Sequence, residues 1–161
     1  MGTGKSSVGR ILARRMKREF VDLDRYIEEK EKRKIHEIFA KEGEPHFRAI
    51  EKEAVSHWAQ KQDWVITTGG GTVMDLENLA ALRQNGVLVT LLAKPETIYE
   101  RVKHSKRRPL LNDAPDLLAG IKNLLEKRKP FYEKSDYYFD TDGKNASQVA
   151  RLIQNVVSKK V

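Results

Sequence analysis

Apolar positions recur along the chain in two kinds of run. Spacings of three and four are typical of amphipathic helices, and short β-branched runs between them are typical of buried strands. The expected helices span 5–19, 26–60 with a break near Gly43, 76–84, 95–103, 116–129 and a last segment capped by Ser147. The expected strands span 20–23, 64–68, 87–93 and 137–140. Strands that alternate with helices predict an α/β fold, in which helices cover both faces of a parallel sheet.

Length and composition narrow the class of protein. A chain of 161 residues is expected to form one domain, over 1–161. It contains no cysteine, which excludes disulfides and thiolate metal sites and weakly favours the cytoplasm. No apolar run is as long as a membrane span, so no membrane segment is expected. The formal net charge of +8 suits either nucleic acid or small polyanionic substrates.

The chain begins inside a glycine-rich motif that is typical of phosphate-binding loops. The matching residues are Gly2, Thr3, Gly4, Lys5, Ser6 and Ser7, which correspond to the later positions of G-x-x-x-x-G-K-[ST]. In such a loop, backbone amides and the lysine bind nucleotide phosphates, and the hydroxyl after the lysine binds Mg²⁺. The N-terminus of the following helix attracts the same phosphates. A chance match before a surface helix is the alternative interpretation.

Two carboxylates follow the second apolar segment. Asp22 and Asp24 come at the end of the expected strand 20–23, where alternation would place both on one side. A carboxylate at the carboxyl end of a strand, beside a phosphate loop, would hold Mg²⁺ or a substrate hydroxyl. A solvated turn is the alternative.

Three further features carry candidate chemistry. Arg48 precedes Glu51 by three residues, so it could pair with that carboxylate or bind a carboxylate ligand, although its position alone favours a solvated arginine. Three glycines, at 69–71, directly follow a strand, which suggests backbone approaching a ligand; a plain flexible loop is the alternative. The basic segment 103–111 could be a lid over phosphates or a nucleic-acid patch. The aromatic residues lack the pattern of an RNA-binding sheet.

In their order along the chain, these motifs resemble those of the shikimate kinases. The set is G-T-G-K-S-S at 2–7, D-L-D at 22–24, F-R at 47–48, G-G-G at 69–71, R-P-L-L at 108–111 and K-R-x-P-x-Y at 127–132. The resemblance implies a nucleoside-monophosphate-kinase-like fold with a five-stranded parallel sheet. It implies Mg²⁺-ATP-dependent phosphorylation of the 3-hydroxyl of shikimate in chorismate and aromatic amino acid biosynthesis, by a cytoplasmic monomer with no nucleic-acid partner.

The resemblance also implies roles for individual residues. The implied catalytic residues are Lys5, Asp24 and Arg108. The implied ATP-binding residues are Gly2, Thr3, Gly4, Lys5, Ser6, Ser7, Arg101, Arg108 and Lys144. Shikimate is expected at Asp24, Arg48, Gly69, Gly70, Gly71 and Arg128, and Mg²⁺ at Ser6 and Asp22. A substrate-binding helical segment over about 25–52 and a lid over about 103–116 complete the expected site.

One departure from the family pattern concerns the strand that precedes the phosphate loop and lies in the middle of the family's sheet. Only four strands are expected here, so its neighbours should lack ladder partners and the core should contain a slot. Our hypothesis is that Met1 is an internal methionine of the loop. The alternative functions are another small-metabolite kinase, such as a gluconate-type kinase, and a truncated or inactive paralogue.

Overall fold

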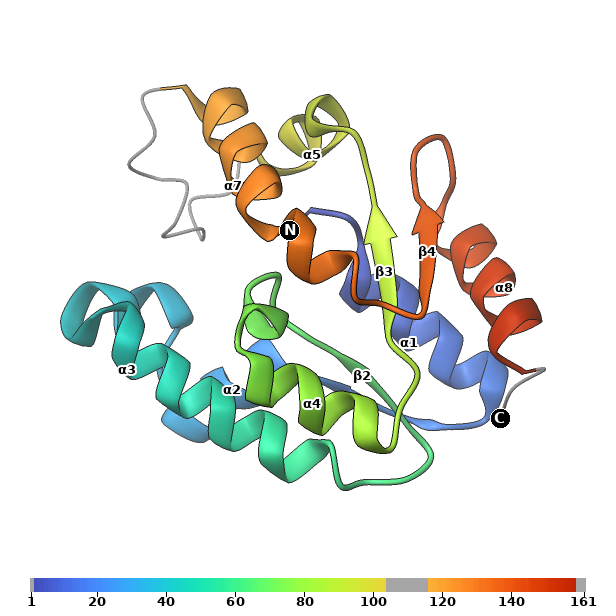
Figure 1. Ribbon diagram of the computed structural model, residues 1–161, viewed down its shortest axis with the longest axis horizontal. Coiled ribbons are helices and arrows are strands. Elements are labelled where there is room, and N and C mark those ends of the chain that lie inside the picture. The colour runs from blue at the N-terminus through green and yellow to red at the C-terminus, as the bar shows by residue number, and fades with distance from the viewer. Residues whose placement is uncertain (1, 104–115, 159–161) are drawn as a thin grey trace.

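The computed structural model describes residues 2–103 and 116–158 and has an α/β architecture (Figure 1). The order of its elements is α1 (Lys5–Met16), β1 (Glu19–Asp22), α2 (Leu23–Glu31), α3 (Ile35–Trp58), β2 (Trp64–Thr67), η1 (Thr72–Met74), α4 (Leu76–Gln84), β3 (Val89–Leu92), α5 (Pro95–Val102), α7 (Leu117–Tyr132), β4 (Tyr137–Asp140) and α8 (Ala146–Val157). In the described part of the chain, no helix has the length and hydrophobicity needed to cross a membrane.

The strands pair in parallel, as predicted, but in two separate sheets. β1 pairs with β2, with Val21 opposite Ile66, and β3 pairs with β4, with Leu91 opposite Phe139. Within the described residues no ladder joins β2 to β3. A cleft of about 720 Å³, lined by both strands, separates their edges. The parallel pairing and the expected slot are therefore confirmed, but in the described residues the strands form two sheets and not one, because backbone groups across such a cleft cannot reach one another.

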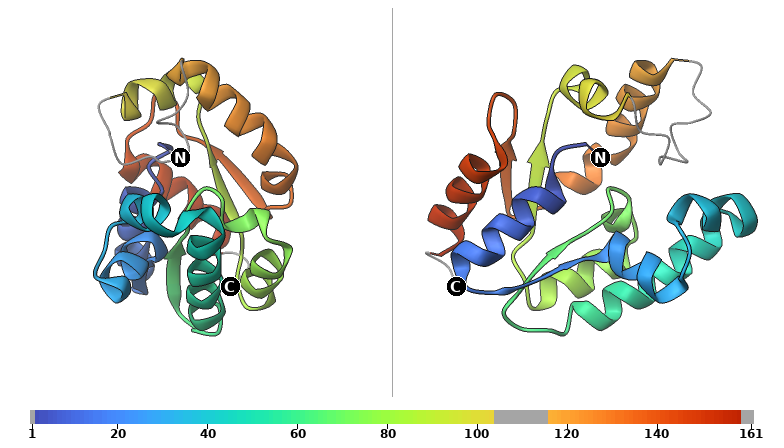
Figure 2. Two further views of the ribbon diagram at one scale, coloured as in Figure 1. Left: turned by 90° about the vertical axis from the view of Figure 1, so that its left-hand side faces the viewer. Right: turned by 180° about the vertical axis from the view of Figure 1, so that it is seen from behind.

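Helices cover the two sheets from several sides. α1 packs against both α8 and β2, and Figures 1 and 2 show α1 and α8 side by side. Val8 and Leu12, one turn apart on α1, are buried against α8. α1 also approaches β2 closely, because a Cβ on Gly9 would lie 2.3 Å from Thr67 Cγ2. Two further hydrophobic clusters lie between helices α2, α3 and α4 and the β1–β2 sheet. A separate cluster forms where α5 packs on α7.

The helical stretch expected over 26–60 with a break near Gly43 has a further, earlier break between α2 and α3. α2 ends at Glu31, and Lys32 adopts a left-handed conformation with φ 52°. α3 then begins at Ile35, and the expected break at Gly43 is confirmed by its φ of 83° and ψ of 173°. The hydrophobic pattern did not predict the break at Lys32, because residues 28–34 are all charged and no apolar residue marks the turn.

Two helix ends also differ from expectation. Pro130 does not end its helix, since α7 continues to Tyr132. Proline lacks a backbone N–H, so the last turn of α7 loses only one hydrogen-bond donor there. Asn145, and not Ser147, caps α8. Its side chain accepts a hydrogen bond from the backbone N of Gln148 at 2.9 Å, and the Gln148 side chain accepts one from the backbone N of Asn145 at 2.8 Å.

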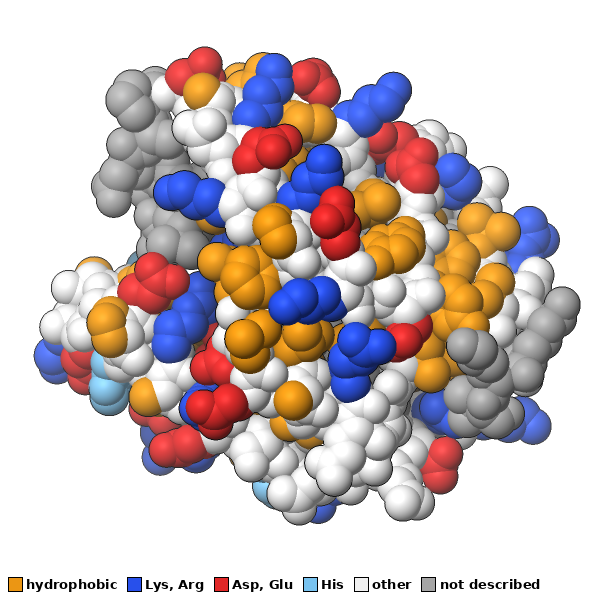
Figure 3. Space-filling view, in the orientation of Figure 1, with side chains coloured by type: hydrophobic (Ala, Val, Ile, Leu, Met, Phe, Trp, Pro, Cys, Tyr) orange, Lys and Arg blue, Asp and Glu red, His pale blue; other side chains and the backbone are white. Residues whose placement is uncertain are grey.

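The basic residues are dispersed on the face drawn in Figure 3. Lys and Arg side chains lie among acidic and hydrophobic ones there and do not gather into one patch.

Candidate functional site

A cleft of about 1260 Å³ opens where the carboxyl ends of β1 and β2 meet the N-terminus of α1. It brings together most of the predicted site residues: Gly2, Gly4, Lys5, Ser6, Ser7, Asp22, Asp24, Arg48, Gly69, Gly70, Gly71, Arg101 and Arg128. Thr3 is buried and faces the cleft between β2 and β3, while Lys144 lies away from the site, with its Nζ donating to the Asp142 carbonyl at 3.4 Å. Arg108 and most of the predicted lid lie outside the described residues.

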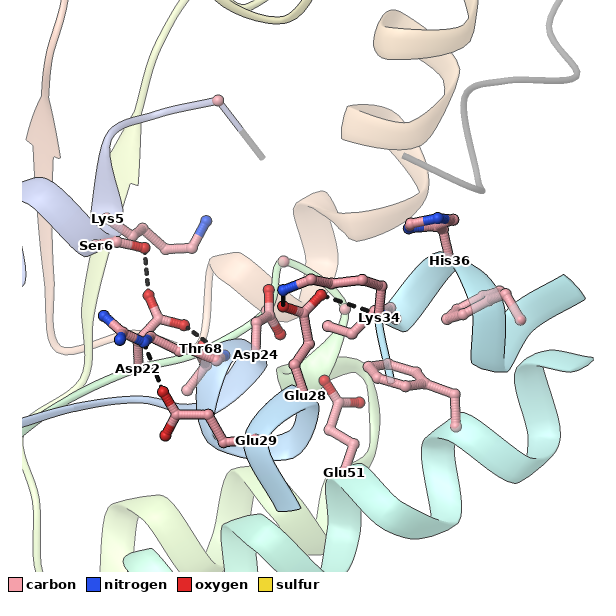
Figure 4. Close-up of a pocket in the computed structure, with 18 of the residues that line it drawn as sticks. Lys5, Ser6, Asp22, Asp24, Glu28, Glu29, Lys34, His36, Glu51 and Thr68 are labelled. Atoms are coloured by element: carbon pink, nitrogen blue, oxygen red, sulfur yellow. Dashed lines mark hydrogen bonds and ion pairs between the residues drawn. The ribbon is translucent and has the colours of Figure 1, made fainter. Parts of the chain in front are cut away.

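The phosphate-loop residues lead directly into α1. Gly2 and Gly4 both have left-handed backbone angles, with φ of 62° and 86°, which glycine adopts without strain. A Cβ on Gly2 would lie 2.9 Å from Val102 Cγ1, so this position also lacks space for a side chain. The Gly4 carbonyl accepts the first helical hydrogen bond, from Val8 N at 2.9 Å. The amino end of α1 and the Lys5 side chain thus face the cleft (Figure 4).

Arg101 holds the start of this loop from α5. Its Nη1 donates to the Gly2 carbonyl and to Thr141 Oγ1, both at 3.2 Å, and its Nη2 donates to the Thr141 carbonyl at 3.4 Å. The guanidinium therefore joins three segments, namely the phosphate loop, α5 and the turn after β4. Its expected contact with ATP stays a prediction.

The two carboxylates of D-L-D come from different elements. Asp22 ends β1 and caps α2, since its Oδ1 accepts a hydrogen bond from Arg25 N at 3.2 Å. Its Oδ2 accepts a hydrogen bond from Ser6 Oγ, which links it to the phosphate loop. Asp24 lies in the first turn of α2, so the predicted strand alternation is wrong after Asp22, because the chain enters a helix there. Both carboxylates nevertheless line the same cleft (Figure 4).

Burial raises the pKa of Asp24 to about 6. The nearby carboxylates of Asp22 and Glu51 contribute to this raised pKa, while the Lys5 ammonium opposes them. A carboxyl group with such a pKa is ionised at neutral pH and is a stronger base than an exposed aspartate. It is suited to accepting a proton from a hydroxyl group held in the cleft.

Arg48 is held by carboxylates on its own helix. Its Nη1 donates to Glu51 Oε2 at 2.6 Å, and its Nη2 donates to Glu44 Oε1 at 2.9 Å. Glu51 is buried, and its other oxygen accepts a hydrogen bond from Thr72 Oγ1 at 2.6 Å. Asn78 Nδ2 in turn donates to the Thr72 carbonyl at 3.2 Å. Of the interpretations that the sequence left open for Arg48, pairing with Glu51 is therefore present, and it fixes the plane of the guanidinium.

At two of the three consecutive glycines, side chains from other elements occupy the space that a Cβ would need. A Cβ on Gly71 would lie 2.5 Å from Arg48 Nη2, and a Cβ on Gly69 would lie 2.9 Å from Asp24 Oδ1. The middle glycine, Gly70, accepts a hydrogen bond through its carbonyl from the Tyr132 hydroxyl at 2.7 Å. The segment is therefore a closely packed spacer between Asp24 and Arg48, and not simply a flexible loop.

Arg128 brings a second guanidinium to the cleft, from α7. Its side chain is buried, and its Nε has no hydrogen-bond partner within the described part of the chain. Buried polar groups are nearly always hydrogen-bonded, so an incompletely bonded guanidinium in a cleft is suited to binding an anion. Sequence reasoning placed both arginines in the site but missed the support from Thr72, Asn78 and Tyr132, which no local spacing reveals.

A glycine-rich loop at a helix N-terminus, followed by lysine and serine and facing a carboxylate on a parallel strand, defines a P-loop kinase. The family model described as shikimate kinase matches residues 1–158. The shikimate kinase of Thermodesulfovibrio yellowstonii is 44% identical over 154 residues, which cover 95% of this chain and 88% of the relative. That of Thermus thermophilus is 44% identical over 160 residues, covering 99% of this chain and 85% of the relative.

Solved structures give the same assignment. The shikimate kinase from Acinetobacter baumannii in complex with shikimate has a TM-score of 0.94 and 35% identity, covering 100% of this chain and 90% of that chain. The enzyme from Aquifex aeolicus has a TM-score of 0.84 and 35% identity, covering 98% of this chain and 92% of that chain. The chain belongs to the shikimate kinase family. Its activity is that of a shikimate kinase, an ATP-using phosphotransferase of the shikimate pathway, as its motifs predicted.

Proposed function

We propose that this cleft holds shikimate beside the γ-phosphate of ATP and that Asp24 deprotonates the 3-hydroxyl of shikimate during transfer. The observation that carries the proposal is the position of Asp24, a half-buried carboxylate with a raised pKa in one cleft with both Lys5 and Arg48. A base between a cationic phosphate site and a cationic carboxylate site matches a substrate that has a hydroxyl group and a carboxylate.

On the substrate side, Arg48 and Arg128 bind the carboxylate of shikimate. Guanidinium groups form paired hydrogen bonds with carboxylates. The guanidinium of Arg48 is already oriented by its hydrogen bonds to Glu51 and Glu44. The backbone of residues 69–71 lies against Arg48 and Asp24 and completes this side of the cleft. The relative from Acinetobacter baumannii, solved with shikimate, supports the choice of ligand.

On the nucleotide side, Lys5 and the amides of the phosphate loop bind the β- and γ-phosphates of ATP. Ser6 and Asp22 would hold Mg²⁺, since they offer adjacent hydroxyl and carboxylate oxygens, which are the ligands this ion prefers. Among the described residues, no three His, Asp or Glu side chains cluster to hold a metal ion on their own. When bound there, the ion would neutralise the negative charge of the phosphates.

In the transfer step, the Asp24 carboxylate takes the proton of the 3-hydroxyl as that oxygen forms its bond to the γ-phosphorus. The bond between this phosphorus and the bridging oxygen breaks, and ADP leaves with the bonding electrons. Lys5 stabilises the charge that gathers on the phosphate oxygens. Arg108 would add a second cation from the predicted lid, whose residues lie outside the described ranges.

The test is ADP release from Mg²⁺-ATP with shikimate, with gluconate and with no acceptor. We expect turnover with shikimate alone, and a loss of turnover in Asp24→Asn while shikimate still binds by calorimetry. Equal turnover with gluconate would contradict the proposed carboxylate and hydroxyl site, and silence with every acceptor would favour an inactive paralogue. Monomeric state, cytoplasmic location and the lack of a nucleic-acid partner remain predictions.

A further inference from the structure

Tyr132, the last residue of α7, has no role in the site proposed above. Its hydroxyl donates to the Gly70 carbonyl at 2.7 Å, across 62 positions of the sequence. Gly70 is the middle residue of the spacer between Asp24 and Arg48. The hydrogen bond therefore joins the end of α7 to the segment on which the substrate side of the cleft is built.

The same helix carries Arg128 one turn earlier. Residues four apart lie on the same face of a helix, so Tyr132 and Arg128 share one side of α7. Arg128 lines the substrate cleft, whereas Tyr132 lines the neighbouring cleft between β2 and β3 and reaches the glycine segment from there. Arg128 is buried but incompletely hydrogen-bonded within the described residues, so its own contacts do not fix its position fully. A hydrogen bond at the end of α7 limits how far this helix can shift relative to the glycine segment.

The opposite end of this connection is Arg48. The Gly71 backbone contacts the Arg48 guanidinium so closely that even a Cβ would lie 2.5 Å from Nη2. A chain of direct contacts thus runs from Arg128 along α7 to Tyr132, to residues 70–71 and to Arg48. It joins the two guanidinium groups that the proposed function assigns to one carboxylate.

We propose that Tyr132 is a positioning residue that sets the separation of Arg128 and Arg48, and thereby the affinity for the shikimate carboxylate. The inference rests on the proposed function, because it requires both arginines to bind the same group. Tyr132 would not touch the substrate. Its hydroxyl holds α7 against the glycine segment, and the aromatic ring alone does not replace this bond.

The test is Tyr132→Phe, which removes the hydroxyl and keeps the ring. Loss of one neutral hydrogen bond should raise Kd and KM for shikimate about fivefold, while kcat and KM for ATP stay within about twofold. Tyr138→Phe is the matched control, since the Tyr138 hydroxyl also donates to a backbone carbonyl at 2.7 Å, that of Glu133, but Tyr138 lines neither cleft. This control should leave both KM values unchanged.

The double variant Tyr132→Phe/Arg128→Lys shows whether the effect passes through Arg128. If it does, the Tyr132→Phe penalty on shikimate binding should largely disappear once Arg128 is replaced. Full additivity would overturn the inference, as would an equal rise in KM for shikimate and ATP together with a marked fall in Tm. If Arg128→Lys alone leaves shikimate binding unchanged, the proposed carboxylate site itself fails. If Tyr132→Phe leaves the affinity for shikimate unchanged while Arg128→Lys weakens it, only the role of Tyr132 is refuted.

Discussion

The two sides of the cleft are built in different ways. The phosphate side consists of residues 2–7, which are contiguous and owe their shape to backbone angles at Gly2 and Gly4 and to the start of α1. The substrate side gathers Asp24, Arg48 and Arg128 from three helices, with the glycine segment between them. The first is local in sequence, and the second depends on tertiary packing.

The supports behind the two sides differ accordingly. Behind Arg48, the buried Glu51 carboxylate bonds to both Arg48 and Thr72, and Asn78 holds the Thr72 backbone. Such a network keeps its members rigid only while all of them are bonded, because a buried charge without a partner is costly. The phosphate loop has the Arg101 bond at Gly2 and the Ser6–Asp22 contact, which bear on single positions. We therefore expect the effect of a single substitution to reach more residues on the substrate side than on the phosphate side.

Asp24→Asn should have the largest effect on turnover. Removing the base should lower kcat by about 10²–10⁴-fold, measured by ADP release. The variant should also be more stable at pH 7.5. The pKa of Asp24 is raised in the folded state, so its contribution to stability is full below the unfolded value of 3.8 and is lost as pH rises through about 6. Asparagine cannot ionise, so it removes the cost of holding a charged carboxylate at this position at pH 7.5. Tm should rise by about 2–4 °C for each kcal/mol of stability gained. A lower Tm with normal kcat would contradict both roles.

Lys5→Met tests the phosphate side at its charged centre. Loss of the ammonium should lower kcat by about 10²–10³-fold and weaken ATP binding, since a positioned cation acts on the charge of the transferred phosphoryl group. Shikimate affinity should change little, because the carboxylate site lies on the other side. The measurements are ADP release and calorimetric titration with each substrate. Weakened shikimate binding of similar size would show that the two sides are not independent.

The pH profile of the unsubstituted enzyme should show the raised pKa of Asp24. The free enzyme needs the carboxylate form, so kcat/KM for shikimate should fall about tenfold per pH unit below a pH of about 6. The fall comes at higher pH than for an exposed aspartate because burial disfavours the charge. The measurement is initial rate against pH at low shikimate concentration. A profile that stays flat down to pH 5 would assign the proton transfer to another group.

Glu51→Gln should disturb the substrate side from behind. The amide keeps the size of the side chain but not its charge, so Arg48 loses its buried ionic partner. We expect KM for shikimate to rise about tenfold and the free energy of unfolding to fall by about 1–3 kcal/mol. Glu44→Gln is the matched control, because Glu44 also bonds to Arg48 but is 45% exposed. Its effect on both quantities should be small, within about 1 kcal/mol.

The difference between the two sides also explains what the sequence could predict. The phosphate loop was found directly, because glycine, lysine and serine at fixed spacing are required by backbone geometry. The strand β4 was predicted with its observed bounds, 137–140, and the other strands to within about two residues. Arg48 and Arg128 were placed by family motifs, not by pattern, because a solvated arginine has the same local context.

The supports of the substrate side were not predicted, because their partners lie far apart in the chain. Thr72 bonds to Glu51 across 21 positions and Tyr132 to Gly70 across 62, and no periodicity connects such pairs. The slot between the two sheets, by contrast, was expected from counting apolar segments. Hydrophobic patterns thus predict which elements exist and where a strand is lacking, whereas long-range polar contacts require the folded structure.

Arg101→Lys should have the smallest effect and tests whether the phosphate loop depends on a distant support at all. Lysine keeps the charge but cannot donate to Gly2 and Thr141 at once, as the guanidinium does. We expect KM for ATP to rise about threefold, with KM for shikimate unchanged. Arg83→Lys is the control, since Arg83 also donates to a backbone carbonyl, that of Lys134, away from the phosphate loop. A rise in KM for ATP of tenfold or more would match the Glu51→Gln effect and would show that tertiary contacts, and not local glycine angles, hold the loop in place.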